Sequence, residues 1–250
     1  MKRKNWLLFI PLFIIIIYSL LNMYNAPLLD SSYDNILLKQ TIWFAIGFAI
    51  IFICKTIRFN RLFKLSFLIY LFNVVLLILV LIVGKEINGA RAWFSFSFFS
   101  FQPSELMRLS LTLFLCSITN NFKFKGLKSE ILYLFLIVLF TLIPSILVFL
   151  EPDTGAIIFY LIIMLTIISL ANINKKWLIF IAIIIITLLG LFFYFYYQKQ
   201  DLLIDLIGTS FFYRIDRLIN FYNNTGYQIE NALTTIGCAT IFGTGIGKIL

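Results

Sequence analysis

Apolar residues occur in long runs separated by short polar segments, and seven of these runs approach or reach the length of a membrane-spanning helix. A helix needs about 20 mostly apolar residues to cross a bilayer. Polar residues interrupt the second run and the start of the fourth, so the ends of these two are the hardest to place. The pattern predicts an all-α fold, a polytopic transmembrane helical bundle of about seven spans. The seven segments are 6–24, 36–54, 66–83, 105–119, 131–150, 154–171 and 177–197.

The charges between these segments alternate in sign. The N-terminus and the loops after the second, fourth and sixth segments carry twelve cations and one acid, Glu130. The other loops hold most of the acidic residues. Short cytoplasmic loops have an excess of Lys and Arg, so the pattern predicts a cytoplasmic N-terminus and, after seven spans, a C-terminus outside. The twelve cations are Lys2, Arg3, Lys4, Lys55, Arg58, Arg61, Lys64, Lys123, Lys125, Lys128, Lys175 and Lys176.

Composition supports a membrane protein and excludes several kinds of chemistry. Of the 250 residues, 62% are hydrophobic and only 12% are charged, which excludes an ordinary water-soluble domain. The net charge of +9 lies in short clusters between spans, so it indicates orientation and not nucleic-acid binding. The sequence has no His, which excludes imidazole catalysis and His metal ligands. Its three Cys are far apart, so neither a disulfide framework nor a metal site is indicated.

The first group of polar residues near the membrane lies in 84–105, which we expect to be an outer loop. Its Phe-rich middle, 93–101, is too short to span and too apolar for water, which predicts a segment in the outer interface. Asn88-Gly89 favours a tight turn before it. Pro103 suits the first turn of the next helix, where Glu105 is also favoured. Arg108 lies three residues later on the same face and can pair with Glu105. Its charged side chain could equally line a cavity or extend to the outer interface.

Two further polar groups lie in predicted outer segments. In the tight turn 151–155, Asp153 or Thr154 can cap the sixth span, and Pro152 ends the fifth. The turn's two carboxylates could instead bind a cation or a sugar. The segment 198–250 forms a large outer loop whose basic pair and polar aromatic residues suit an anionic lipid headgroup. The whole chain, 1–250, is predicted to be a single membrane domain.

Four motifs in these segments carry a resemblance to a known family. They read NGARAWF from residue 88, FQPSELMRL from 101, EPDTG from 151 and YRIDRLINFYNNTGYQIENALTTIGCATIFGTGIG from 213. In order and spacing they resemble the SEDS family of shape, elongation, division and sporulation proteins, which includes RodA, FtsW and SpoVE. The chain departs from the family pattern at Arg108 (usually Lys), Glu151 (usually Gln), Asn231 (commonly Ser) and 238–240 (usually Ser-Gly-Gly).

The resemblance implies an all-helical peptidoglycan glycosyltransferase in the bacterial plasma membrane. The substrate of this enzyme would be lipid II, and its partners would be a class B penicillin-binding protein and membrane lipid. The resemblance leaves open whether a divalent cation assists. It places Arg91, Glu105 and Arg108 in the substrate cavity, with cations receiving the diphosphate. The remaining residues of the motifs would have structural or outer-loop roles: Trp93, Gln102, Pro103, Ser104, Pro152, Asp153, Gly155, Arg217, Tyr227 and Gln228.

Family members usually have ten spans and an acidic motif, P-E-A-x-T-D-F-I-F, that carries their proposed catalytic Asp, whereas this chain stops after seven predicted spans, inside the large outer loop. That motif is not present in residues 1–250. We therefore expect this chain to correspond to the N-terminal part of such an enzyme and to be inactive alone, with its catalytic residue unidentified. Two alternatives remain at this point: a lipid II flippase or transporter, and a non-catalytic membrane partner of the elongation or division machinery.

Overall fold

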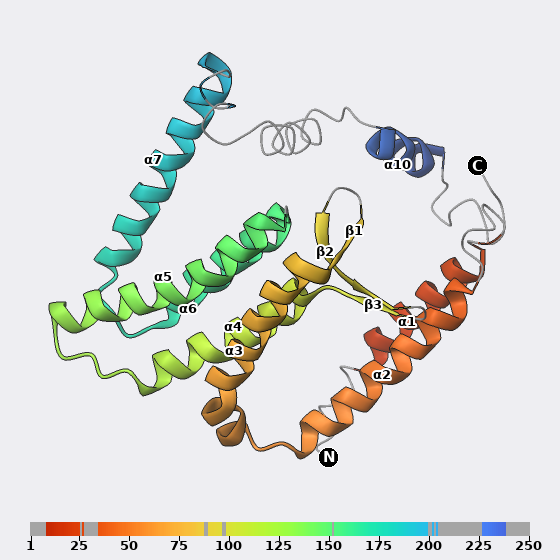
Figure 1. Cartoon of the computed structure of the whole chain (residues 1–250), viewed down its shortest axis with the longest axis horizontal. Helices are drawn as coiled ribbons and strands as arrows, with labels where there is room; N and C mark the ends of the chain where they lie inside the picture. The colour runs from red at the N-terminus through yellow and green to blue at the C-terminus, as the bar shows by residue number, and fades with distance from the viewer. Residues whose placement is uncertain are drawn as a thin grey trace. The chain divides into compact units, whose positions relative to one another are not determined.

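The structure is a computed structural model of the chain (Figure 1). It describes residues 9–25, 27, 35–87, 90–96, 99–151, 153–199, 202, 204 and 227–238. The chain divides into two compact units, which are described separately. One unit contains residues 1–56 and 212–250, and the other contains residues 57–211.

The first unit contains helices α1 (Phe9–Asn25), α2 (Ile36–Thr56) and α10 (Tyr227–Cys238). Helices α1 and α2 contact each other, and the rings of Phe13 and Phe48 stack with centroids 5.8 Å apart. No residue of α2 is buried. An apolar helix that buries none of its residues is suited to a lipid environment rather than to water.

The second unit contains α3 (Phe59–Val83), α4 (Pro103–Asn121), α5 (Leu127–Leu150), α6 (Thr154–Leu170) and α7 (Lys176–Gln198). Together with α1 and α2, these helices contain almost all residues of the seven predicted segments, which confirms the all-α class. Of the described helices, α2, α3, α5 and α7 are long and apolar enough to cross a membrane. The number of spans and the cytoplasmic position of the N-terminus stay predictions.

A small antiparallel sheet between α3 and α4 was not predicted. Strand β2 (Ala90–Ser95) pairs with β1 (Lys85–Ile87) and with β3 (Ser100–Phe101) in the order β1-β2-β3. Strand pairing satisfies part of the backbone hydrogen-bonding capacity of this Phe-rich segment. Ile87 pairs with Ala90 across the predicted Asn88-Gly89 turn, whose two residues lie outside the described ranges. The interfacial position of the segment stays a prediction.

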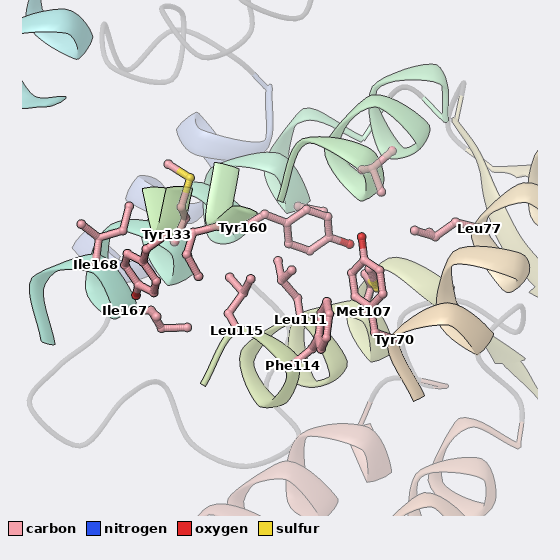
Figure 2. Close-up of a cluster of buried hydrophobic side chains, with 14 residues drawn as sticks. Tyr70, Leu77, Met107, Leu111, Phe114, Leu115, Tyr133, Tyr160, Ile167 and Ile168 are labelled. Carbon is pink, nitrogen blue, oxygen red and sulfur yellow. The ribbon is translucent and has the colours of Figure 1, made fainter. Parts of the chain in front are cut away.

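The buried core of the second unit lies where α4 contacts α3, α5 and α6 (Figure 2). Helix α4 contributes fully buried Met107, Leu111 and Leu115, and α6 contributes Tyr160. From α3, the ring of Tyr70 lies 4.8 Å from that of Phe114. This close packing fixes the positions of the starts of α4 and α6, where two of the four sequence motifs lie.

A proline inside α5 creates a second contact between helices. Pro144 has no N–H, so the carbonyl of Phe140, four residues earlier, lacks its usual helical donor. The hydroxyl of Tyr70 on α3 donates to that carbonyl at 2.8 Å. A backbone group that the proline leaves unpaired is thus satisfied by a neighbouring helix, as an apolar environment demands.

At the opposite end of α5 from the 151–155 turn, Glu130 joins the starts of α5 and α7. Its carboxylate accepts from the indole N–H of Trp177 at 2.7 Å and from the backbone N–H of Asn174 at 3.3 Å. Glu130 is also the one acid that the charge pattern places among the twelve cations. Its role here is to hold two helix starts together.

Candidate functional site

The start of α4 has the form that its sequence predicts. Gln102 is the N-cap residue, Pro103 begins the helix and Glu105 lies in the first turn. Proline loses nothing at this position, because the first N–H groups of a helix have no partner within it. The predicted helix start at Pro103 and the placement of Glu105 in its first turn are therefore confirmed.

Asp153 links the start of α4 to the start of α6. It is the N-cap of α6, and its Oδ1 accepts from the backbone N–H of Ala156 at 3.2 Å, as the sequence predicts. Its Oδ2 accepts from the side-chain amide of Gln102 at 2.6 Å and from the hydroxyl of Ser104 at 3.4 Å. One carboxylate thus joins the FQPSE and EPDTG motifs, which are about fifty residues apart in the sequence. We call Gln102, Ser104 and Asp153 the α4–α6 clamp.

Tyr160 strengthens the same junction from within the core. Its side chain is fully buried on α6, and its hydroxyl donates to the backbone carbonyl of Ser104 at 2.9 Å. Sequence reasoning did not identify Tyr160. A Tyr among apolar neighbours, seven residues after a capping Asp, was the signal available.

Glu105 and Arg108 form an ion pair on one face of α4. Nη1 of Arg108 lies 2.9 Å from Oε2 of Glu105, which confirms the pairing predicted from their spacing. The guanidinium carbon of Arg108 lies 4.1 Å from the ring centroid of Phe159 on α6, a cation–π contact. Nε of Arg108 is buried and has no hydrogen-bond partner among the described residues. The group is thus oriented by a carboxylate and an aromatic ring while one of its donors stays unused.

Glu151 lies in the turn between α5 and α6, next to the α4–α6 clamp. Its side chain is fully buried, and neither carboxyl oxygen has a hydrogen-bond partner in the described part of the chain. Burial, and then the negative charge of Asp153, raise the pKa of Glu151 to about 8. The sequence marks Glu151 as a departure from the family pattern but gives no sign that it is buried.

Arg91 and Trp93 lie on β2, not on the helices that form the ion pair and the α4–α6 clamp. Arg91 on β2 lies opposite Glu86 on β1, with its side chain exposed. Within the described ranges, no hydrogen bond or ion pair joins Arg91 to the pair on α4. Trp93 is partly buried on β2. A Cβ on Gly155 would meet only Oδ1 of Asp153, at 3.5 Å, so close packing does not require a glycine there.

Several predicted site residues lie outside the part of the chain that the structure describes. Pro152 and Arg217 lie outside the described residues, as does most of the segment 198–250. Tyr227 and Gln228 begin α10, but their side chains are not described. Within the described ranges, no group of three or more Cys, Asp or Glu residues could hold a metal ion.

Comparison with known proteins identifies the family. The family described as "Cell cycle protein", covering FtsW, RodA and SpoVE, matches residues 3–249. A protein of Wigglesworthia glossinidia brevipalpis, "Probable peptidoglycan glycosyltransferase FtsW", is 30% identical over 226 residues, covering 88% of this chain and 55% of that protein. A protein of the same name from Haemophilus influenzae is 31% identical over 186 residues, covering 72% and 43%.

Two solved structures are similar in fold and sequence. The rod shape determining protein RodA of Thermus thermophilus has a TM-score of 0.54 and 28% identity, covering 70% of this chain and 57% of RodA. A chain of a peptidoglycan synthase complex that coordinates polymerization and crosslinking has a TM-score of 0.57 and 27% identity, covering 77% and 57%. The chain thus spans about half the length of the curated relatives it matches. With a family match over nearly all its residues and four described helices able to cross a membrane, it is a multi-pass plasma-membrane protein that belongs to the FtsW, RodA and SpoVE family.

Proposed function

We propose that this chain supplies the N-terminal part of a peptidoglycan glycosyltransferase that polymerises lipid II during cell elongation or division. Two findings support this proposal. The chain belongs to the family, and its relatives have names that describe peptidoglycan glycosyltransferases. The structural observation that carries the proposal is the oriented Glu105–Arg108 pair at the start of α4. The α4–α6 clamp fixes the position of that helix start.

This arrangement suits the leaving group of the reaction. Glycosyl transfer from a lipid diphosphate requires positive charge where the diphosphate departs. A guanidinium binds phosphate oxygens through several N–H donors, and the Arg108 side chain keeps 26% of its surface exposed. The N-terminus of a helix also favours an anion. Arg108 would therefore bind the diphosphate, and Glu105 would hold the guanidinium in position.

The base that removes the proton of the acceptor hydroxyl is a separate part of the proposal. We infer that it is the Asp of the acidic family motif that residues 1–250 do not contain. These residues alone would then bind lipid II without polymerising it. We also propose a class B penicillin-binding protein as partner, because one similar chain belongs to a peptidoglycan synthase complex.

The test is a glycan-polymerisation assay with purified lipid II. We expect residues 1–250 to form no polymer and a chain extended through the acidic motif to form it. In the extended chain, Arg108→Ala should lower the rate about 10²-fold or more, because a charge-stabilising donor is lost. Arg108→Lys should retain part of the rate. Lys123→Ala, which changes an exposed residue in the loop just after α4, is the matched control and should leave the rate unchanged.

Three outcomes would overturn the proposal. Robust polymer formation by residues 1–250 alone would show that the missing Asp is not the base. Lipid II movement across vesicles by the extended chain, without any polymer, would favour a flippase. Co-purification with a class B penicillin-binding protein without polymerase activity from the extended chain would favour a non-catalytic partner.

A further inference from the structure

Glu151 is the one carboxyl group among the described residues that is fully buried with both oxygens unpartnered. An ionised carboxylate in such a place costs several kcal/mol unless donors or a cation compensate it. The described residues provide neither: no hydrogen bond reaches its oxygens, and no basic group lies within ion-pairing distance. A neutral carboxylic acid is much less costly to bury than a carboxylate.

The charged surroundings of Glu151 also disfavour its ionised form. Asp153 in the same turn carries a charge of the same sign and acts on Glu151. Tyr160 on α6 lies within electrostatic range of both, and also of the Glu105–Arg108 pair on α4. The single cation in this group, Arg108, is already paired with Glu105. Ionisation of Glu151 would therefore place two carboxylates in one turn, with no unpaired cation among the described residues of this group to separate them.

We propose that Glu151 is a proton-binding site: the folded protein holds its carboxyl group in the neutral form, and loss of that proton to water weakens the junction of α4, α5 and α6. The weakening follows from the position of Asp153. That residue joins α4 to α6 through Gln102 and the cap at Ala156, and a second negative charge beside it would repel it from this position. The proposal concerns the described residues and does not depend on the proposed enzymatic activity.

The sign of the pH dependence follows from linkage. The folded state binds this proton more tightly than the unfolded state, in which Glu has its ordinary pKa of 4.5. Stability should therefore be greatest below about pH 5 and should fall as the pH rises to about 8. Above that pH, this contribution is lost and no further change is expected from Glu151.

Glu151→Gln provides the direct test, because a carboxamide has nearly the same shape and stays neutral at every pH. Thermal unfolding of the purified full chain in detergent should be compared for wild type and variant between pH 5 and 9. We expect the unfolding equilibrium constant of wild type to rise relative to that of the variant, by up to about tenfold per pH unit. Glu86→Gln, which changes an exposed residue on β1, is the matched control and should follow wild type.

Infrared spectroscopy tests the protonation state without relying on a variant that folds. Labelling the Glu side-chain carboxyls with ¹³C identifies bands from the five glutamates alone. At pH 7, wild type should show a labelled C=O band of a protonated acid, and this band should disappear as the pH passes about 8. Asp153→Asn should move this transition to lower pH, because it removes the neighbouring negative charge.

Absence of a protonated band at pH 7 in folded wild type would overturn the proposal. So would parallel stability profiles for wild type and Glu151→Gln from pH 5 to 9. Stabilisation of wild type by millimolar Mg²⁺, lost in Glu151→Gln, would also overturn it, because the two carboxylates would then form a cation site.

Discussion

Helices α2 and α5 are similar in length and apolar character, but their side chains have different surroundings. Helix α5 buries five residues against its neighbours, whereas α2 buries none: the five are Tyr133, Ile137, Thr141, Pro144 and Val148. In lipid, apolar residues gain little by leaving the solvent, so close packing and polar contacts hold helices together. The comparison shows that hydropathy identifies helices able to cross a membrane, while specific contacts decide which of them form a packed core.

We expect the largest loss of stability from a substitution in the packed core. Leu111→Ala removes a fully buried side chain from α4 and should lower the free energy of unfolding by about 2–4 kcal/mol. Ile50→Ala changes a side chain on α2 that is 53% exposed, so it should change the same quantity by less than about 0.5 kcal/mol. Unfolding in detergent would measure both. Equal losses would mean that α2 is packed as tightly as the core.

Loss of the α4–α6 clamp should have the next largest effect. Asp153→Ala removes a helix cap and the acceptor for Gln102 and Ser104, so it should destabilise by about 2 kcal/mol. Glu230→Ala removes an exposed carboxylate from the first turn of α10 and serves as the control. It should cost no more than about 0.5 kcal/mol. A cost that small for Asp153→Ala would show that packing alone joins α4 to α6.

We expect the smallest loss of stability from removing the hydrogen bond between Tyr70 and the Phe140 carbonyl. Tyr70→Phe leaves the Phe140 carbonyl without a donor and should cost about 1 kcal/mol. In a Pro144→Ala background the backbone N–H returns, so the same change should cost much less. A double-mutant cycle measures this coupling, and Tyr197→Phe on α7, which is 65% exposed, is the control. Equal costs in the two backgrounds would contradict the coupling.

Local features of the fold were predictable from the sequence because they depend on nearby residues. The apolar runs correspond to helices, Pro103 begins α4 and Asp153 caps α6. Each of these features depends on residues within one or two turns of each other. The Glu105–Arg108 pair is of the same kind, because a spacing of three residues places both on one helix face.

Contacts between distant segments were not predictable in this way. The clamp depends on how α4 packs against α6, which no local pattern specifies. Glu151 and Asp153 are two residues apart and chemically alike, yet one is buried without partners and the other accepts three hydrogen bonds. The strands between 85 and 101 were missed because their short Phe-rich sequence also fits an interfacial segment.

The contact between Tyr70 and Phe140 has a consequence for how the chain is made. Translation delivers α3 before α5, so the phenol is already in place when the proline-containing helix follows it. A newly inserted α5 with no earlier neighbour would expose the Phe140 carbonyl to hydrocarbon. The order of synthesis therefore gives the helix that is made first the donor that the later helix lacks.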